Sequence, residues 1–432
     1  MGDSRQALQN IRGKFLRGFN RAATRLGLPR ARLTADELIR LARRRSGLDD
    51  FGEWAFEEPL TVLLEAYEKE ARLSAFGRVG ARWDMLRFLL NLLRLREEEK
   101  REPQILGETI SQPIFILGLP RSGTTFLHNL LAQDSANRVP RCWQTVYPYP
   151  EAGLKGRKGD LRARDVARKF DSFLALAPEF RSLHPLDAYG AQECIEITGQ
   201  VIRSLRFDTT HYVPSYAAWL EEAGHLEAYS FHKRFLQHLQ HQAGPGRWVL
   251  KTPDHIFAIE ALQAVYPDAR FIFVHRDPME VLPSVARLTE ILRQPFTQYV
   301  DRLQIGRQVN DSWIRGSRRL IELSEELRDS PERMFHVRYD RLTRKPLNVV
   351  AEIYRHFRIP MSERGEDAIR REIAERPNGG YGRNSYRFED YGIDTAAVSR
   401  EYNEYVNYFR TKVGSVVRTP HWATEAHQLA AS

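Results

Sequence analysis

Cysteine is scarce, with Cys142 and Cys194 as the whole complement of 432 residues. Two cysteines cannot build a disulfide framework, and their spacing is not that of zinc ligands, so we expect a reducing compartment. Long apolar runs are also missing, because the most apolar short run, 85–95, is interrupted by two arginines and an asparagine. A transmembrane helix needs roughly 18 apolar residues, and a signal peptide needs an apolar segment near the N-terminus. The sequence predicts neither.

The chain also lacks a broad excess of charge. It holds 65 Lys and Arg against 56 Asp and Glu, a net charge of +9. Residues 1–45 contain 12 of the basic and 3 of the acidic residues, which leaves 53 of each sign in residues 46–432. A body without net charge offers no extended cationic surface to a polyanion, so no nucleic-acid partner is expected. With 42% apolar residues the chain can bury a large core, which excludes global disorder.

The N-terminal charge lies on a predicted helix. Within residues 4–26 apolar side chains recur every three or four positions beside a basic stripe: Leu8, Ile11, Phe15, Phe19, Ala22 and Leu26, with Lys14, Arg17, Arg21 and Arg25. Gly27 and Pro29 would end this helix, and Thr34 with Glu37 forms a capping box for a second one. We expect the basic helix to contact anionic lipid at the inner membrane surface or a second subunit.

The hydrophobic period changes near residue 113. Helical periodicity fills 59–99, with a break expected near Gly77 to Gly80, and then four apolar runs typical of buried strands alternate with helices: 114–117, 248–250, 271–274 and 334–339. This alternation predicts an α/β fold with a P-loop-like central parallel sheet flanked by helices. The predicted organisation is a helical N-terminal region, 1–104, a domain at 105–415 with a helical insert at 150–245, and a tail at 416–432.

The first predicted strand runs directly into a glycine-containing turn, Gly118-Leu-Pro-Arg-Ser-Gly123-Thr-Thr125. Its spacing is that of the P-loop G-x-x-x-x-G-K-[ST], except that Thr124 replaces the lysine. Such a loop points backbone N–H groups at an anion on a helix N-terminus. Because the lysine that spans two phosphates is missing, we expect binding of one phosphate group and regard a nucleoside triphosphatase as disfavoured.

The segment Pro-Arg-Ser-Gly-Thr-Thr at 120–125 resembles the 5'-phosphosulfate loop of the sulfotransferases that use 3'-phosphoadenosine 5'-phosphosulfate (PAPS). Gly-Leu-Asp-Asp-Phe-Gly at 47–52 is similar to an element of their large bacterial and mycobacterial branch, and the resemblance extends over about residues 46–412. It implies the P-loop-like sulfotransferase fold, PAPS as sulfuryl donor, 3'-phosphoadenosine 5'-phosphate (PAP) as product and no metal. The implied donor-binding residues of this loop are Arg121, Ser122, Gly123, Thr124 and Thr125.

Two further strand ends carry residues similar to family motifs. Arg276, directly after the third predicted strand, and Ser284, eight residues later, fit the 3'-phosphate motif, since Arg offers a forked donor matched to phosphate. Lys251-Thr-Pro-Asp-His255 is similar to the Lys-Thr-His strand end of the cytosolic enzymes, with Pro253 at the place of their catalytic histidine. The resemblance implies that Lys251 neutralises charge on the leaving oxygen. His255 is a candidate base or, alternatively, a cap of the following helix.

The remaining candidates lie outside these strand ends. Tyr339 is similar to the tyrosine that contacts the adenine, although an ordinary aromatic at a strand end is an equal alternative. Arg383, in a glycine-rich loop, occupies the region where sulfotransferases close over the 3'-phosphate. Glu193, on a helix face shared with Glu196, would face the acceptor hydroxyl and is a second candidate base. His184, just before that helix, is the third.

Together these residues predict a sulfotransferase that moves the sulfuryl group of PAPS in line to a hydroxyl of a small-molecule acceptor. Glu193, His255 or His184 would take the proton while Lys251 and the loop hold the developing charge. Aromatic residues of the insert suit a lipophilic alcohol or phenol, or simply pack its helices. The alternatives are a P-loop-like kinase or NTPase and a membrane-surface adaptor whose body only binds a nucleotide. We expect a cytoplasmic protein that is either free in the cytoplasm or bound peripherally at the inner membrane surface.

Overall fold

The computed structural model describes residues 2–28, 33–150, 161–183, 186–377 and 387–413, with side chains from residue 13 onward. Within this part a parallel sheet is formed by β1 (Ile114–Leu117), β2 (Asn137–Arg138), β3 (Arg247–Lys251), β4 (Arg270–His275) and β5 (Met334–Arg338). The order is β2-β3-β1-β4-β5, and every pairing is parallel, so the carboxyl ends share one edge. The predicted α/β fold is confirmed. Strand β2 was not predicted, because two residues carry no periodicity.

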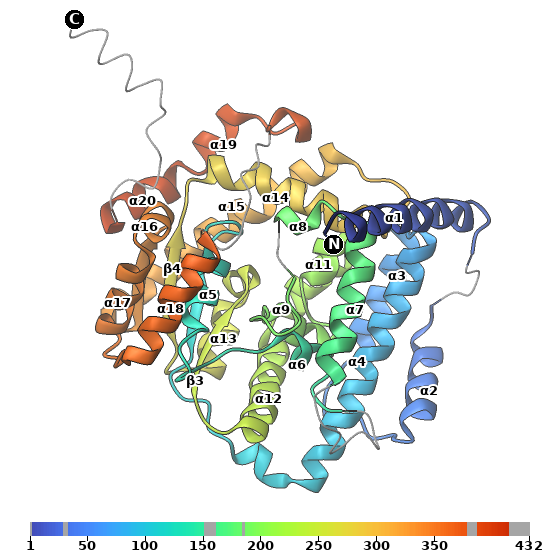
Figure 1. Cartoon of the computed structure of the whole chain (residues 1–432), viewed down its shortest axis with the longest axis horizontal. Coiled ribbons are helices and arrows are strands. Elements are labelled where there is room, and N and C mark those ends of the chain that lie inside the picture. Colours follow the sequence, from blue (N-terminus) through green and yellow to red (C-terminus); the bar gives the residue numbers. More distant parts are fainter. Residues whose placement is uncertain (1, 29–32, 151–160, 184–185, 378–386, 414–432) are drawn as a thin grey trace, which may run out of the picture.

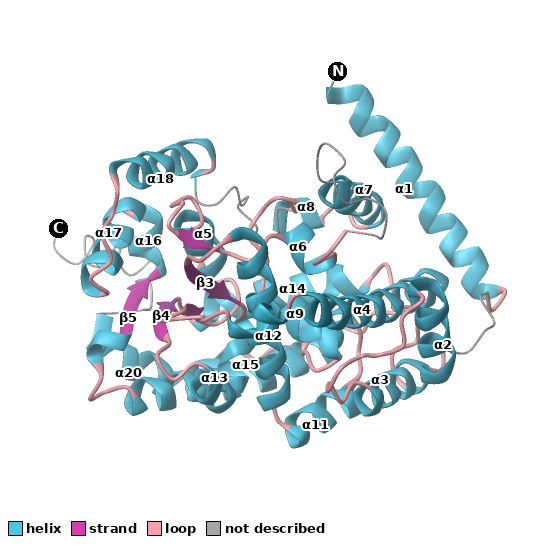
Figure 2. Ribbon diagram, turned by 90° about the horizontal axis from the view of Figure 1, so that it is seen from below, coloured by secondary structure: helices cyan, strands magenta, loops and turns pink. Residues whose placement is uncertain are grey.

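Side chains that alternate along the strands build a core on each face of the sheet. Ile114, Ile116 and Val249 face one core. This face is covered by α5 (Thr124–Leu131), α16 (Tyr339–Arg344), α17 (Pro346–His356) and α18 (Glu363–Glu375). Phe115 and Leu250 face the other core. Its helices on the sheet side are α13 (Ile259–Val265), α14 (Pro278–Arg293), α15 (Arg302–Glu326), α19 (Thr395–Glu401) and α20 (Asn403–Val413) (Figures 1 and 2).

The N-terminal region is helical, as predicted. It contains α1 (Gly2–Arg25), α2 (Ala35–Ser46), α3 (Glu57–Lys69) and α4 (Ala75–Arg101), and the apolar faces of α2, α3 and α4 extend the second core. The predicted capping box is present in part, since the Glu37 amide donates to Thr34 Oγ1 at 3.4 Å. The predicted break near Gly77 is wrong, because the chain turns at 70–74 instead. Gly77 lies inside α4, where a Cβ would stand 2.0 Å from the Phe296 carbonyl oxygen.

The predicted insert is largely helical. It and the segment before it form α6 (Cys142–Val146), α7 (Leu161–Leu176), α8 (Phe180–Leu183), α9 (Ile195–Thr198), α10 (Arg206–Thr210), α11 (Pro214–Ala223) and α12 (Leu226–Ala243). Short 3₁₀ turns join other elements: Pro103–Gly107, Gly199–Val201, Pro253–Ala258, Pro331–Arg333 and Glu389–Tyr391. Among the described residues, no helix combines the length and the apolar character needed to span a bilayer.

Candidate active site

The P-loop lies at the carboxyl end of β1 and opens into α5. Gly123 precedes α5 with φ 97°, and a Cβ there would come within 2.7 Å of the Tyr339 ring, so this turn requires glycine. Arg121 also has positive φ, 63°, which turns the loop so that it wraps the helix N-terminus. The Ser122 hydroxyl is buried and has no hydrogen-bond partner among the described residues. A glycine turn, a helix N-terminus and an unsatisfied hydroxyl together fit an anion.

Lys251 ends β3 directly beside this loop. Its register partner on β1 is Ile116, and its side chain is 1% exposed. The Lys251 ammonium donates to Thr125 Oγ1 at 2.8 Å and to Glu193 Oε1. The P-loop helix and the strand that ends in lysine are therefore linked through their functional side chains. A buried, paired ammonium in this position can stabilise negative charge that develops beside the loop.

His128 also joins α5 to β3. Its Nε2 lies 3.1 Å from the Val249 carbonyl oxygen, and since a carbonyl can only accept, Nε2 carries the proton. Burial, with the nearby Lys251 charge, lowers the pKa of His128 to about 3. In the sequence this histidine is marked by nothing more than its place on an apolar helix. We interpret it as a neutral support that fixes the helix of the phosphate loop against the Lys251 strand.

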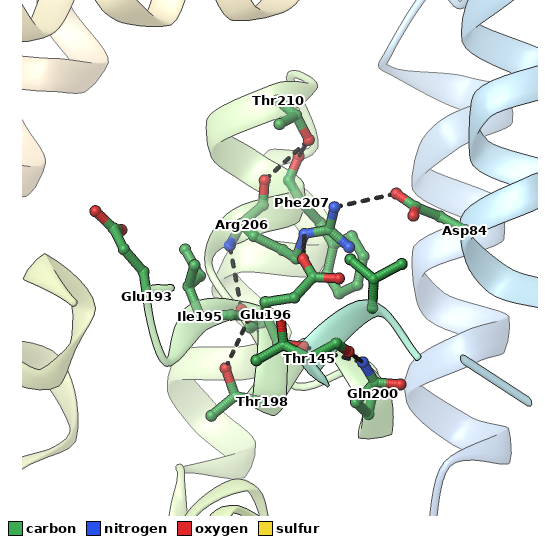
Figure 3. Close-up of polar contacts among 12 residues, drawn as sticks. Asp84, Thr145, Glu193, Ile195, Glu196, Thr198, Gln200, Arg206, Phe207 and Thr210 are labelled. Carbon is green, nitrogen blue, oxygen red and sulfur yellow. Dashed lines mark hydrogen bonds and ion pairs between the residues drawn. The ribbon is translucent and has the colours of Figure 1, made fainter. Parts of the chain in front are cut away.

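Glu193 and Glu196 point to different surroundings. The sequence prediction that they share a helix face is wrong, because Glu193 precedes α9 and extends away from Glu196 (Figure 3). Glu196 is buried and pairs with Arg87 at 2.6 Å and Arg206 at 3.5 Å, and Asp84 completes this network. This network anchors α9 to α4 and α10. Only Glu193 reaches the Lys251 site.

The second anion motif is brought to the P-loop by α14. Arg121 Nε donates to Ser284 Oγ at 3.2 Å, and Arg276 Nη1 donates to the Arg121 carbonyl at 2.8 Å. Arg276 also pairs with Glu280 at 2.9 Å, and its guanidinium lies 4.2 Å from the centre of the Tyr339 ring. Asp277 caps α14 by accepting a hydrogen bond from the Met279 amide at 2.9 Å. Arg276 and Ser284, which follow β4, and Tyr339, which follows β5, thus meet the phosphate loop.

His255 lies in the interior of the protein and not at its surface. It is fully buried, its Nδ1 is hydrogen-bonded to the Tyr229 hydroxyl, and Phe115 packs edge-on at 4.9 Å. Burial holds the pKa of His255 well below its usual value, so the ring is neutral. It does not cap the following helix either. These contacts hold the ring in the core, while its Nε2 is buried without a hydrogen-bond partner among the described residues, so His255 stays a predicted candidate base.

Asp254 is a residue that the sequence analysis did not single out. It lies three positions after Lys251, in the 3₁₀ turn that follows β3, and its Oδ2 is buried without a hydrogen-bond partner among the described residues. Burial, followed by the charges of Glu193 and Asp208, raises the pKa of Asp254 to about 8, against an opposing effect of Lys251. The neighbouring Thr252 hydroxyl is likewise buried and unsatisfied. The end of β3 therefore carries more unsatisfied polar atoms than the motif alone indicated.

Two predicted site residues, His184 and Arg383, lie outside the described residues. The other predicted positions follow the carboxyl ends of β1, β3, β4 and β5, apart from Glu193, which reaches Lys251 from the segment before α9. Ligands of open parallel sheets bind at this edge. In the part of the chain that the structure describes, no group of acidic, histidine or cysteine side chains is arranged to hold a metal ion.

The family follows from comparison of the whole chain with known proteins. A family model described as the sulfotransferase family matches residues 113–363, more than half of the sequence. The chain belongs to the sulfotransferase family. The matched range includes the P-loop, Lys251 and Arg276. This membership confirms the predicted enzyme class in preference to the kinase and adaptor alternatives.

Mycobacterial sulfotransferases are similar to this sulfotransferase in sequence and structure. The crystal structure of STF1 from Mycobacterium tuberculosis H37Rv has a TM-score of 0.75 and 32% identity, covering 86% of this chain and 99% of that one. STF9 from Mycobacterium avium has a TM-score of 0.78 and 30% identity, covering 87% and 96%. The omega-hydroxy-beta-dihydromenaquinone-9 sulfotransferase Stf3 of Mycobacterium tuberculosis is 26% identical over 65% of this chain and 72% of its own length. The predicted branch is thereby confirmed.

Proposed function

We propose that this sulfotransferase transfers the sulfuryl group of PAPS to the hydroxyl of a lipophilic alcohol or phenol. The observation that carries the proposal is the meeting of the P-loop, Lys251 and the Arg276–Ser284 pair at one sheet edge. Two proposed anion sites, both in contact with the P-loop that Lys251 also contacts, match a donor with a 3'-phosphate and a 5'-phosphosulfate. A simple nucleoside triphosphate would use only one of them.

The residues at the site fit such a donor. The loop around Gly123, with the unsatisfied Ser122 hydroxyl, would hold the 5' end, and Arg276 with Ser284 would hold the 3'-phosphate. Tyr339, already beside Arg276, would contact the adenine. The donor supplies the activated sulfuryl group. Lys251 then stabilises the negative charge left on the 5'-phosphate oxygen when the sulfuryl group departs, which lowers the transition-state energy.

A lipophilic acceptor is supported by the chemistry of a relative. Stf3 is named for omega-hydroxy-beta-dihydromenaquinone-9, and an omega-hydroxyl is an alcohol group. Within the insert, aromatic residues such as Phe173 and Trp219 are only partly buried. An acceptor of this class would be met at a membrane surface. We therefore propose a cytoplasmic enzyme that works peripherally at the inner membrane.

Ligand titration tests the donor assignment. We expect PAP to bind without magnesium and at least about tenfold more tightly than ATP, since hydrogen bonds to its 3'-phosphate are worth about 1.5 kcal/mol or more. Isothermal calorimetry with PAP, ATP and ATP plus magnesium gives the comparison. Equal or tighter binding of magnesium ATP would contradict the proposal. Turnover is then measured with labelled PAPS and a panel of alkyl alcohols, sterols, phenols and saccharides.

A further inference from the structure

Helix α1 packs against the body with the side that its sequence pattern would leave in solvent. Gly13, Arg17, Asn20 and Thr24 face the protein, while Phe15 and Phe19 are 73% and 57% exposed. Successive helical residues are turned by about 100°, so positions 13, 17, 20 and 24 lie opposite positions 15, 19, 22 and 26. The usual arrangement, with the apolar stripe toward the core, is therefore reversed.

Specific polar contacts fix this orientation. Asn20 Oδ1 accepts from the Phe76 amide at 2.9 Å, and Thr24 Oγ1 accepts from the Ala75 amide at 2.8 Å. Both residues thus satisfy N–H groups of the first turn of α4, which have no partner within that helix. Arg17 donates to the Ala175 carbonyl on α7 at 3.3 Å. At Gly13 a Cβ would stand 2.3 Å from that same oxygen. The close approach of α1 to α7 thus selects which side faces outward.

The outward apolar stripe is formed by Phe15, Phe19, Ala22 and Leu26, and it continues onto α4. Leu26 is 65% exposed, Phe19 lies 6.2 Å from the Phe76 ring, and Val79 and Trp83 of α4 are 56% and 39% exposed. Figure 2 shows α1 along the outside of the molecule, at the end away from the sheet. Exposed apolar side chains clustered in this way mark a contact surface.

The charge beside this stripe decides which partner fits. Lys14, Arg21 and Arg25 are exposed on the flank of the same helix, and no acidic residue occurs between residues 13 and 28. A helix with an outward apolar stripe and a cationic flank matches the plane between lipid headgroups and acyl chains of an anionic membrane. A second copy of the chain would bring the same positive charges together. We infer that the outward apolar stripe and its basic flank bind the surface of an anionic bilayer.

Vesicle co-sedimentation of the full chain tests this surface. We expect binding to vesicles of phosphatidylcholine with 30% phosphatidylglycerol, little binding to pure phosphatidylcholine, and weakening by salt. Two triple variants should each reduce the partition coefficient by at least about tenfold: Phe15→Ser/Phe19→Ser/Leu26→Ser and Lys14→Glu/Arg21→Glu/Arg25→Glu. Each basic residue near the surface and each apolar group buried in the bilayer contributes to the binding free energy. These positions are exposed, so folding should be retained, and thermal unfolding of each variant checks this.

The matched control reverses three exposed charges elsewhere, Arg400→Glu/Arg410→Glu/Lys412→Glu, and should bind vesicles as the wild type does. Failure of the wild type to bind anionic vesicles overturns the inference. A dimer in light scattering that the serine variant dissociates, without vesicle binding, would identify a second copy as the occupant instead. Neither readout requires sulfuryl transfer, so the result is independent of the proposed function.

A second inference concerns Asp254 and rests on the proposed function. Glu193 is held by the Lys251 ammonium, which leaves it poorly suited to accept a proton, whereas Asp254 Oδ2 has no hydrogen-bond partner among the described residues. Glu193, Asp208 and Lys251 are the charged groups that act on Asp254. Two of them, Glu193 and Lys251, are paired with each other at the site. We propose that Asp254 is the catalytic residue that takes the acceptor's proton.

The chemical step balances with this assignment. The acceptor O–H bond breaks as its oxygen bonds to sulfur, and the proton passes to Asp254 Oδ2. The bond from sulfur to the bridging oxygen breaks, and its electron pair remains on the 5'-phosphate of PAP beside Lys251. A base is most effective when its pKa lies near the working pH, and that of Asp254 is raised to about 8. Because only the carboxylate accepts a proton, kcat/KM should rise with pH through about 8 and then level.

Asp254→Asn tests the role without changing the shape of the side chain. We expect a loss in kcat of about 100-fold with an alkyl alcohol, disappearance of the rise in kcat/KM near pH 8, and a much smaller loss with a nitrophenol, which releases its proton unaided. Glu222→Gln on the exposed face of α11 is the control and should keep the wild-type profile. If Asp254→Asn retains the rise of kcat/KM with pH, or loses kcat equally with both acceptors, Asp254 is not the base. Absence of any turnover by the wild type would instead count against the proposed function.

Discussion

Replacing Lys251 with methionine should lower kcat by about 10²- to 10³-fold, while the Kd for PAP changes only a few-fold. Methionine fills similar volume but removes the charge that is buried beside the loop. In the proposed function this charge stabilises the departing phosphate oxygen in the transition state. A group that acts mainly in the transition state affects kcat and leaves ground-state binding nearly intact. Single-turnover kinetics with labelled PAPS, together with PAP titration, separates the two quantities.

The contact between Lys251 and Glu193 requires a second variant, because removing one partner of a buried ion pair leaves the other uncompensated. If the loss arose only because the Glu193 carboxylate no longer has the Lys251 charge beside it, Lys251→Met/Glu193→Gln would recover most of the activity. We expect no recovery beyond a few-fold. Lys69→Met provides the control, since Lys69 is an exposed lysine of α3 that pairs with Glu65 on the same helix. Wild-type kcat in Lys251→Met would contradict the assigned role.

Replacing Arg276 with alanine should weaken PAP binding by about 10- to 150-fold. This range corresponds to the loss of about 1.5 to 3 kcal/mol from hydrogen bonds between a guanidinium and a phosphate. The predicted loss is specific for the 3'-phosphate. Adenosine 5'-phosphate, which lacks that group, should therefore bind the variant and the wild type almost equally in calorimetric titrations.

The comparison between the two nucleotides also separates binding from loop structure. Arg276 donates to the Arg121 carbonyl and lies against Tyr339, so its loss could disturb the P-loop itself. Disturbance of the loop would weaken both nucleotides together, which would count against a direct 3'-phosphate contact. Arg307→Ala, an exposed arginine of α15, should leave both affinities unchanged.

Local sequence was sufficient to predict those parts of the site that are formed by residues close together in the chain. The glycine turn after an apolar run predicted the P-loop, and Arg276 with Ser284 and Lys251 could be recognised from strand ends and spacing. Parallel strands then bring these ends to one edge, so the grouping follows from the fold class. Sequence patterns could not predict β2, which has two residues, or the position of Gly77 inside α4, because both depend on contacts with distant segments.

The acceptor side of the site is the part that could be predicted least well from the sequence. Histidine and glutamate residues in this part of the sequence were interpreted as candidate bases. In the structure His255 is buried in the core against Phe115 and Tyr229. Glu196 is held away from the site by its ion pairs with Arg87 and Arg206. No sequence pattern singles out Asp254, because its raised pKa results from burial in a position near Glu193 and Lys251. A pKa of this kind depends on the surroundings in three dimensions.

The sequence by itself determined the enzyme class, the phosphate loop and the position of the charge excess in the first 45 residues. It also determined that α1 is amphipathic. Only the tertiary structure decided which side of α1 faces solvent, because the close approach at Gly13 and the bonds from Asn20 and Thr24 to α4 select the polar side for packing. Periodicity defines two faces of a helix, but the complementary surface of the neighbouring elements chooses between them.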